Sequence, residues 1–395
     1  MLNTCHKYLT TTAIAFFAIV LTAGCVSQPS PPQEESPKSS SPVFYPAPPE
    51  PPRYQFLTSF KGADDFNRKG SGMDSFLGSA STGGDEIKKP YGVTLRHGMI
   101  YLGDTSSGVF QWDLVNRKFM AFKGSKGLGK IVQPINVSSD SEGNTYVCDP
   151  VRKQVLQYDK NDIFIRAYSN PEAWKPVDAE AFEGKLYVAD STGGTGGVKV
   201  FDQKSGQLID TFGVKGTPEQ TLGIAVNIAF DKDGFLYVVD AHKFMIMRYD
   251  RDGHFRGSLG GPGDSPGFFG RPRGIAIDRE GRTYVVDAAF DVVQVFAQTG
   301  QLLTFFGDEK DAPGSLTLPA GIFIDYDNID HFKQFAAPGF EIDYLILVTS
   351  QFNKYQAINV YAHGRMQGVQ YKTDQELYQE MLEKAEREKG EKPKK

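Results

Sequence analysis

Cysteine is scarce in this sequence, with three residues at positions 5, 25 and 148. Their spacing matches neither a zinc site nor a disulfide framework. Cys5 precedes His6 but has no second cysteine three residues upstream, which excludes covalently attached haem. Cys148 lies in the strand-like run "TYVCD", where we expect a buried thiol, with a reactive thiol as the alternative. We therefore expect no haem cofactor.

Clusters of basic residues are also missing from the part of the sequence that reads as folded. The formal net charge is -5, and no stripe of Lys and Arg resembles the footprint of a nucleic-acid binder. The motifs GxSxG, Walker, Rossmann and HExxH are absent from any supporting context. These absences exclude nucleic acid as a partner and leave the common catalytic motifs without support.

The first 24 residues read as an export signal. Lys7 precedes the apolar run "TTTAIAFFAIVLTAG", which is short for a membrane span. The run ends in "LTAGC", which resembles the lipobox of bacterial lipoproteins, with Leu21 one residue further from Cys25 than the pattern prefers. The resemblance implies cleavage before Cys25 and lipidation of that cysteine. The alternative is ordinary secretion with a free Cys25.

Residues 25–53 are rich in proline and serine and poor in apolar side chains. Such a segment cannot bury a core, so we expect a solvated, extended tether. No Asp follows Cys25, which among Gram-negative lipoproteins indicates sorting to the outer membrane. The expected localisation is therefore an exported protein anchored by lipid, on the periplasmic side or at the cell surface.

A phrase of four residues recurs six times at intervals of 42 to 49 residues. Each copy is followed by a second and a third strand-like run, and most by a fourth that ends near "FG". Four short strands per period of about 45 residues predict a β-propeller. The six copies are "PYGV" at Pro90, "PINV" at Pro134, "PVDA" at Pro176, "AVNI" at Ala225, "PRGI" at Pro272 and "PAGI" at Pro319.

These copies resemble NHL repeats, and the resemblance covers residues 54–364. It is strongest in the fifth copy, "GPGDSPGFFGRPRGIAIDREGRTYVVD". It implies an all-β, six-bladed, monomeric propeller. The sixth copy lacks a fourth strand, whereas "RYQFLTSFKG" at residues 53–62 is a spare one. We expect this N-terminal strand to close the ring, because closure removes an exposed sheet edge.

Two segments fall outside the repeat. An insert at residues 326–343 contains Phe332, Phe335 and Phe340, so it either packs on a face of the propeller or meets a partner. Residues 365–395 form a tail in which Thr373 and Glu376 fit a capping box at the start of a helix. The helix either docks on the propeller or binds a partner.

An aspartate ends the second strand of five copies. Catalysis needs a residue once, whereas an Asp at a strand end accepts backbone N–H bonds and fixes the following turn. We therefore assign a structural role to the set. Its members are Asp104, Asp149, Asp190, Asp240 and Asp287.

The first strand of each copy is expected to line the central channel. Its entry position is glycine in three copies but Asn136, Asp178 and Asn227 in three consecutive ones. Oxygen-bearing side chains of this kind suit Ca²⁺, and six-bladed lactonases and paraoxonase-like enzymes are similar in holding Ca²⁺ in the channel. The alternative is that Asn and Asp adopt the left-handed backbone that glycine also tolerates.

Arg271 and Arg273 flank Pro272 at a blade entry and are candidates for binding an anion, with exposed turn arginines as the alternative. The histidines do not support the zinc site of peptide-amidating lyases, which have a similar fold. They occupy unrelated repeat positions: His97, His242, His254 and His331.

Fold alone does not fix activity. We favour a non-enzymatic function. The first hypothesis is a lipid-anchored scaffold that binds a protein or glycan of the cell envelope. Some NHL lipoproteins that this chain resembles accompany exported multihaem cytochromes. The alternative is a Ca²⁺-dependent hydrolase, lactonase or lyase that works in the channel, and a purely structural spacer is a third reading.

Overall fold

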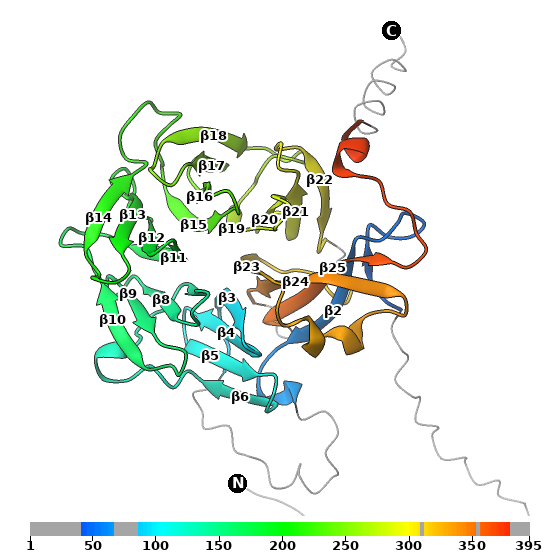
Figure 1. Cartoon of the computed structure of the whole chain (residues 1–395), viewed down its shortest axis with the longest axis horizontal. Coiled ribbons are helices and arrows are strands. Elements are labelled where there is room, and N and C mark those ends of the chain that lie inside the picture. Colours follow the sequence, from blue (N-terminus) through cyan, green and yellow to red (C-terminus); the bar gives the residue numbers. More distant parts are fainter. Residues whose placement is uncertain (1–40, 67–85, 309–311, 353–355, 380–395) are drawn as a thin grey trace, which may run out of the picture. The chain divides into compact units, whose positions relative to one another are not determined.

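The computed structural model describes residues 41–66, 86–308, 312–352 and 356–379 of the chain. These residues form six antiparallel sheets around a central channel, which confirms the predicted six-bladed β-propeller (Figure 1). The export signal, the lipobox and Cys25 lie outside the described residues. No helix in the described ranges is long and apolar enough to cross a membrane.

Blades 1 to 5 have four strands each, and the first strands pack against one another around the channel. Blade 1 contains β3 (Pro90–Arg96), β4 (Met99–Asp104), β5 (Gly108–Asp113) and β6 (Lys118–Ala121). Blade 2 contains β7 (Val137–Ser139), β8 (Thr145–Asp149), β9 (Gln154–Tyr158) and β10 (Phe164–Tyr168). Blade 3 contains β11 (Pro176–Phe182), β12 (Lys185–Asp190), β13 (Gly197–Asp202) and β14 (Leu208–Phe212).

The second half of the ring repeats this arrangement and ends with a larger sheet. Blade 4 contains β15 (Ala225–Phe230), β16 (Leu236–Asp240), β17 (Met245–Tyr249) and β18 (Phe255–Gly260). Blade 5 contains β19 (Pro272–Ile277), β20 (Thr283–Asp287), β21 (Val292–Phe296) and β22 (Leu302–Phe306). Blade 6 contains β23 (Pro319–Asp325), β24 (Phe340–Ser350) and β25 (Ile358–Met366), followed in the sheet by β2 (Tyr54–Phe60) and β1 (Phe44–Tyr45).

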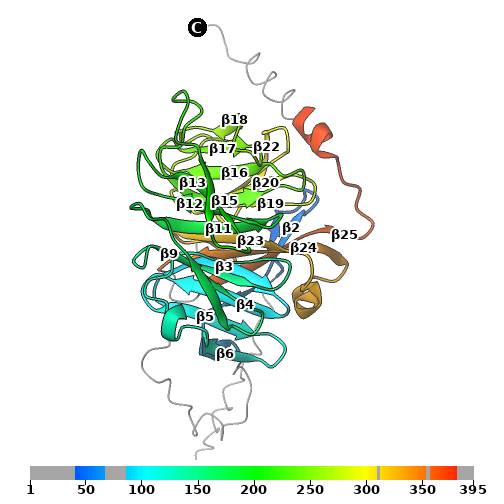
Figure 2. The same cartoon turned by 60° about the vertical axis from the view of Figure 1, so that its left-hand side comes forward.

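The N-terminal strand closes the ring as predicted. β2 pairs antiparallel with β25, with Tyr54 opposite His363 and Phe60 opposite Ile358; Figure 2 shows the two strands side by side. The tether was predicted to stay solvated up to residue 53, but β1 adds a fifth strand to blade 6. Its Tyr45 is 4% exposed and packs against aromatic rings of blades 5 and 6. Phe44 and Tyr45, an aromatic pair within the Pro/Ser-rich segment, therefore pack this part of the chain against the hydrophobic core.

The hydrophobic core is divided into six clusters, one at each boundary between neighbouring blades. Large aromatic residues fill them, among them Trp112 between blades 6 and 1 and Tyr158 between blades 1 and 2. Both side chains are fully buried, and burying a large apolar side chain contributes roughly 1.5–3 kcal/mol. Each cluster is formed by two neighbouring blades, so the stability of the propeller depends on all six blades being in place.

The antiparallel strand order gives the ring two different faces. The turns between second and third strands and the connections between blades lie at one end, which we call the connection face. The turns between first and second strands lie at the other end together with the 326–343 insert, and we call it the insert face.

The insert packs against the propeller. Phe332 and Phe340 are buried in the cluster between blades 6 and 1, whereas Phe335 is 41% exposed. Two short 3-10 turns, Ile329–His331 and Lys333–Phe335, form its centre. The side chain of Gln55 in β2 donates to the Phe335 carbonyl and accepts from Ala337 N. The insert is thus a fixed part of its face.

The predicted helix of the tail begins at residue 374 and is described as far as residue 379, whereas the first two residues of the predicted tail belong to β25. The capping box is confirmed: Glu376 N donates to Thr373 Oγ1 at 3.2 Å, and Thr373 N donates to the Glu376 carboxylate at 2.7 Å. Two further 3-10 turns, Ala63–Asp65 and Gly127–Gly129, lie in connections between blades.

Candidate functional site

The aspartates that end the second strands are confirmed as structural residues. Asp149 accepts backbone N–H bonds from Val132 at 2.6 Å and Gln133 at 3.0 Å, both before its blade, and from Arg152 at 3.0 Å in the following turn. Each aspartate therefore links the connection that precedes its blade to the turn that follows its second strand. The other members make the same kind of bonds: Asp104, Asp190, Asp240 and Asp287.

A second family of aspartates, which sequence reasoning missed, holds the turns of the insert face. Asp231 accepts from the backbone N–H groups two and four residues later, at 3.0 and 2.8 Å. Asp140 and Asp278 make the same pair of bonds in their blades. The signal was present in the recurring turns "DSEGN", "DKDGF" and "DREGR".

The channel-mouth residues predicted as metal ligands do come together, as a hydrogen-bonded clasp. The amide nitrogens of Asn136 and Asn227 both donate to the carboxylate of Asp178, the latter at 2.6 Å. The same carboxylate accepts backbone N–H bonds from Ala179 and Ile228, both at 2.8 Å. Four donors therefore satisfy a side chain that is 3% exposed.

The orientation of the two amides matters for metal binding. Asn136 Oδ1 accepts from Val137 N at 2.9 Å, and Asn227 Oδ1 accepts from Ile275 N at 2.7 Å. Ca²⁺ is bound through oxygen, yet both amides turn nitrogen toward the carboxylate. Calcium binding by this trio would require both amides to rotate and give up these bonds.

The alternative explanation, that these positions require a left-handed backbone, is wrong because none of the three residues has a positive φ. The glycines at the equivalent positions also have ordinary φ angles, and close packing explains them instead. A Cβ on Gly92 would lie 1.7 Å from Asn136 Oδ1, and one on Gly321 would lie 2.2 Å from the Tyr91 carbonyl oxygen. Adjacent blades approach too closely at the channel mouth for a side chain on every strand.

Behind the clasp the channel contains a cavity of about 160 Å³ lined by the first strands. Its walls carry both polar and aliphatic side chains, and Glu180 is the second carboxyl group on them, two residues beyond Asp178 on β11. Glu180 is half-buried and has no hydrogen-bond partner among the described residues. Burial raises the pKa of Asp178 to about 7, and burial together with the nearby Asp178 raises the pKa of Glu180 to about 8.

The two arginines predicted to bind an anion have different surroundings. Arg271 is exposed, and its backbone N–H donates to Asp287 at 2.9 Å. Arg273 is half-buried, and its guanidinium donates to the hydroxyl of Tyr91 in blade 1 at 3.2 Å.

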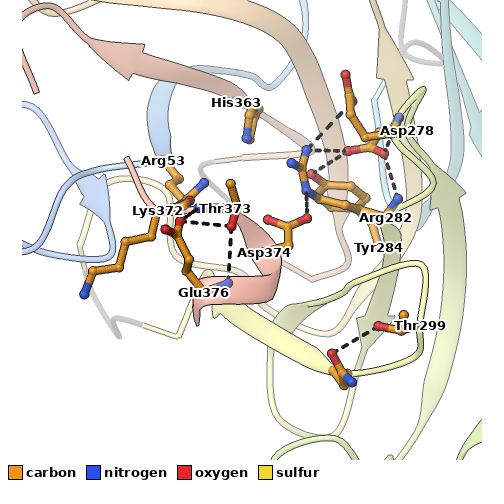
Figure 3. Close-up of polar contacts among 12 residues, drawn as sticks. Arg53, Asp278, Arg282, Tyr284, Thr299, His363, Lys372, Thr373, Asp374 and Glu376 are labelled. Carbon is orange, nitrogen blue, oxygen red and sulfur yellow. Dashed lines mark hydrogen bonds and ion pairs between the residues drawn. The ribbon is translucent and has the colours of Figure 1, made fainter. Parts of the chain in front are cut away.

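A second cavity, of about 340 Å³, lies between blade 5, the N-terminal segment and the tail. Arg282 connects the propeller to the tail there, with Asp278 at 3.1 Å on one side and Asp374 at 2.9 Å on the other (Figure 3). The Tyr344 hydroxyl donates to Asp278 at 2.8 Å and lies 2.6 Å from the Tyr284 hydroxyl. Arg282 and Asp374, two lining residues of opposite charge, pair with each other, and this ion pair holds the tail against the ring.

One turn brings three possible metal ligands together: Asp250, Asp252 and His254. The Asp250 carboxylate accepts from the backbone N–H groups of Asp252 and His254 and pairs with Arg256 at 2.6 Å. These bonds are those of an ordinary aspartate turn.

Comparison with known proteins identifies the architecture. No protein-family model matches the chain, and no curated protein matches it in sequence. A protein of unknown function from Bacteroides thetaiotaomicron is similar in structure, with a TM-score of 0.55 and 14% identity over 78% of this chain and 75% of that one. The likeness is one of fold.

Two other solved structures are similar more distantly. Virginiamycin B lyase from Staphylococcus aureus has a TM-score of 0.46 at 14% identity, covering 72% of this chain and 86% of the lyase. Regucalcin, a calcium-binding protein from Agrobacterium tumefaciens, has a TM-score of 0.47 at 13% identity, covering 72% and 92%.

Proposed function

We propose that this chain is an NHL-type propeller lipoprotein that acts as a binding scaffold in the bacterial cell envelope. In this proposal Cys25 carries the lipid anchor and residues 26–41 form the tether. The partner is an exported protein or glycan assembly, of which a multihaem cytochrome system is one example.

The clasp around Asp178 carries this proposal. It occupies the channel mouth with four internal hydrogen bonds, and the cavity behind it, at about 160 Å³, is smaller than the roughly 300–1,000 Å³ of typical ligand pockets. We therefore place the binding function on the outer surface of the propeller rather than in its channel. There the insert face presents Phe335 on a segment that is otherwise packed against the ring, and exposed aromatic residues are common in protein contacts.

Site-specific photo-crosslinking in cells tests the scaffold. A photoreactive amino acid replaces Phe335 on the insert, or Phe305 on the outer strand β22 as a control of similar exposure. We expect one discrete adduct from position 335 and none from position 305. Acylation is tested in parallel by labelling with an alkyne fatty acid, which Cys25→Ala should abolish. Absence of both adduct and label would reject the proposal.

Glu180 supports the second candidate, a hydrolase or lyase that acts in the channel with Ca²⁺. A carboxyl group whose pKa is about 8 is protonated at neutral pH and can serve as a general acid. Elemental analysis of residues 26–395 decides between the two functions. About one Ca²⁺ per chain, lost in an Asn136→Ala, Asp178→Ala, Asn227→Ala triple variant, would favour the enzyme. No metal in either chain would reject it.

A further inference from the structure

Three exposed aliphatic residues cluster on the connection face over blades 1 and 2. The side chains of Leu128, Val132 and Val151 are 80, 57 and 56% exposed. Hydrogen bonds hold their loops together: Arg152 donates to the Leu128 carbonyl at 3.1 Å, and Val132 N donates to Asp149 at 2.6 Å. These side chains therefore lie at the tips of two adjoining, internally fixed loops.

The same two loops are strongly basic, which corrects the expectation that the folded part lacks clusters of basic residues. Residues 123–133 and 150–153 contain five Lys or Arg and no Asp or Glu. None of the five forms an ion pair with a described residue within 4 Å, although Arg152 is held by carbonyl groups. Together with the three aliphatic residues they form what we call the basic-apolar patch: Lys123, Lys126, Leu128, Lys130, Val132, Val151, Arg152 and Lys153.

The chemistry of this patch fits a lipid surface better than a protein. Protein hot spots are rich in Trp, Tyr and Arg and sit in desolvated pockets, whereas here short aliphatic tips project from the loops among flexible lysines. Aliphatic residues that enter the headgroup region, surrounded by cations that meet anionic lipid, are typical of peripheral membrane contacts.

The position of β1 and the length of chain that precedes it are consistent with a membrane contact at this patch. β1 lies at the outer edge of blade 6, which adjoins blade 1 in the ring. The eighteen residues 26–43 separate β1 from Cys25 and span up to about 55 Å at roughly 3.1 Å per residue. A lipid on Cys25 therefore leaves the patch within reach of the bilayer that holds it.

We propose that the basic-apolar patch docks on an anionic lipid surface and turns the connection face toward the membrane. The proposal rests on the proposed lipid-anchored scaffold and adds an orientation to it. With the connection face on the bilayer, the insert face and Phe335 point away from it, toward a partner. Lipidation supplies most of the membrane affinity, and the patch determines which face of the propeller meets the membrane.

The test uses residues 26–395 with a histidine tag at residue 26, held on nickel-chelating lipids in place of the acyl anchor. An environment-sensitive dye is attached to Val151→Cys in the patch, or to Ser141→Cys, an exposed turn residue of the same blade on the insert face. Vesicles contain phosphatidylcholine alone or with 30% phosphatidylglycerol. We expect a blue shift of emission only from position 151 and only with phosphatidylglycerol.

Charge and apolar variants check the cause. Without the tag, binding to phosphatidylglycerol vesicles should weaken about fivefold for each lysine neutralised among Lys126, Lys130 and Lys153. In the chain labelled at position 151, Leu128→Ser with Val132→Ser should abolish the blue shift without changing the melting temperature, because both side chains are exposed. Equal emission from positions 151 and 141 would overturn the proposal.

Two further outcomes separate this proposal from others. Binding to polyglutamate but not to vesicles would overturn it in favour of an acidic protein partner. The vesicle experiment needs no acylation, so an unlabelled Cys25 in cells would reject the proposed anchor while leaving this result unaffected.

Discussion

Asn227 donates its side-chain amide to Asp178 across the boundary between blades 3 and 4, at 2.6 Å. The oxygen of that amide accepts from the backbone of Ile275 in blade 5, and Asn136 in blade 2 donates to the same carboxylate. One buried carboxylate therefore links four consecutive blades at the channel mouth. Its role explains why polar residues replace glycine in three adjacent copies of the repeat.

Asp178→Asn should destabilise the propeller although the two side chains have the same shape. The new amide nitrogen would face two of the four donors that now bond to the carboxylate. Each buried donor left unpaired costs about 1 to 3 kcal/mol. Urea denaturation should show a lower free energy of unfolding.

Glu180→Gln is the matched control for that variant. Glu180 lies two residues further along β11 on the same channel wall and has no hydrogen-bond partner in the described part of the chain. At pH 8, where the Asp178 carboxylate is largely ionised, substitution of Glu180 should not lower the free energy of unfolding. An equal loss in both variants would show that the clasp is not the cause.

The two carboxyl groups also predict a pH dependence of stability. Burial raises the pKa of Asp178 to about 7 and that of Glu180 to about 8, whereas both are about 4 in an unfolded chain. Between about pH 4 and pH 8 the folded state binds more protons, so the free energy of unfolding from these groups falls as pH rises.

Denaturation curves at pH 4, 6 and 8 test this dependence. Glu180→Gln should match the wild type near pH 4 and be relatively more stable at pH 8, because it removes one group whose ionisation opposes folding. A variant with the same slope as the wild type across this window would contradict the assignment.

Asp287→Ala should be among the most damaging substitutions outside the apolar core. It removes the acceptor of three backbone N–H groups, those of Gly270, Arg271 and Ala289. We expect a loss of about 3 kcal/mol or more. Ser350 holds the equivalent place in blade 6 and accepts one bond, from Thr317 N at 3.3 Å, so Ser350→Ala should cost about 1 kcal/mol.

The ring and its supports were predictable because they repeat. Copies of one phrase at near-constant spacing indicated six blades, and the surplus strand at residues 53–62 indicated how they close. The aspartates at the second-strand ends were assigned correctly because a residue needed in every blade is structural.

The channel mouth was not predictable from the same pattern. Asp178 bonds to residues 42 and 49 positions away, and the direction of each amide depends on backbone groups of the next blade. Gly92 and Gly321 are required by the distance between neighbouring blades rather than by their own φ angles. Such contacts between blades leave no local periodicity in the sequence.

Removing β2 should open the ring, whereas removing the residues before it should not. A chain of residues 42–395 retains β1, β2 and every described contact, so its melting temperature should equal that of residues 26–395. A chain of residues 61–395 loses the buried side chains of Tyr54, Leu57 and Phe60, each of which contributes roughly 1.5–3 kcal/mol. That sum is a large share of the about 5–15 kcal/mol that stabilises a typical domain.

The shorter chain should also aggregate, because the loss of β2 exposes the paired edge of β25. A synthetic peptide of residues 42–60 added during refolding should restore a soluble, cooperatively melting propeller by supplying the missing strands. A peptide in which Tyr54 and Phe60 are replaced by Ser should fail to do so. Soluble, cooperative melting of residues 61–395 alone at the temperature of the longer chain would show that closure by β2 is dispensable.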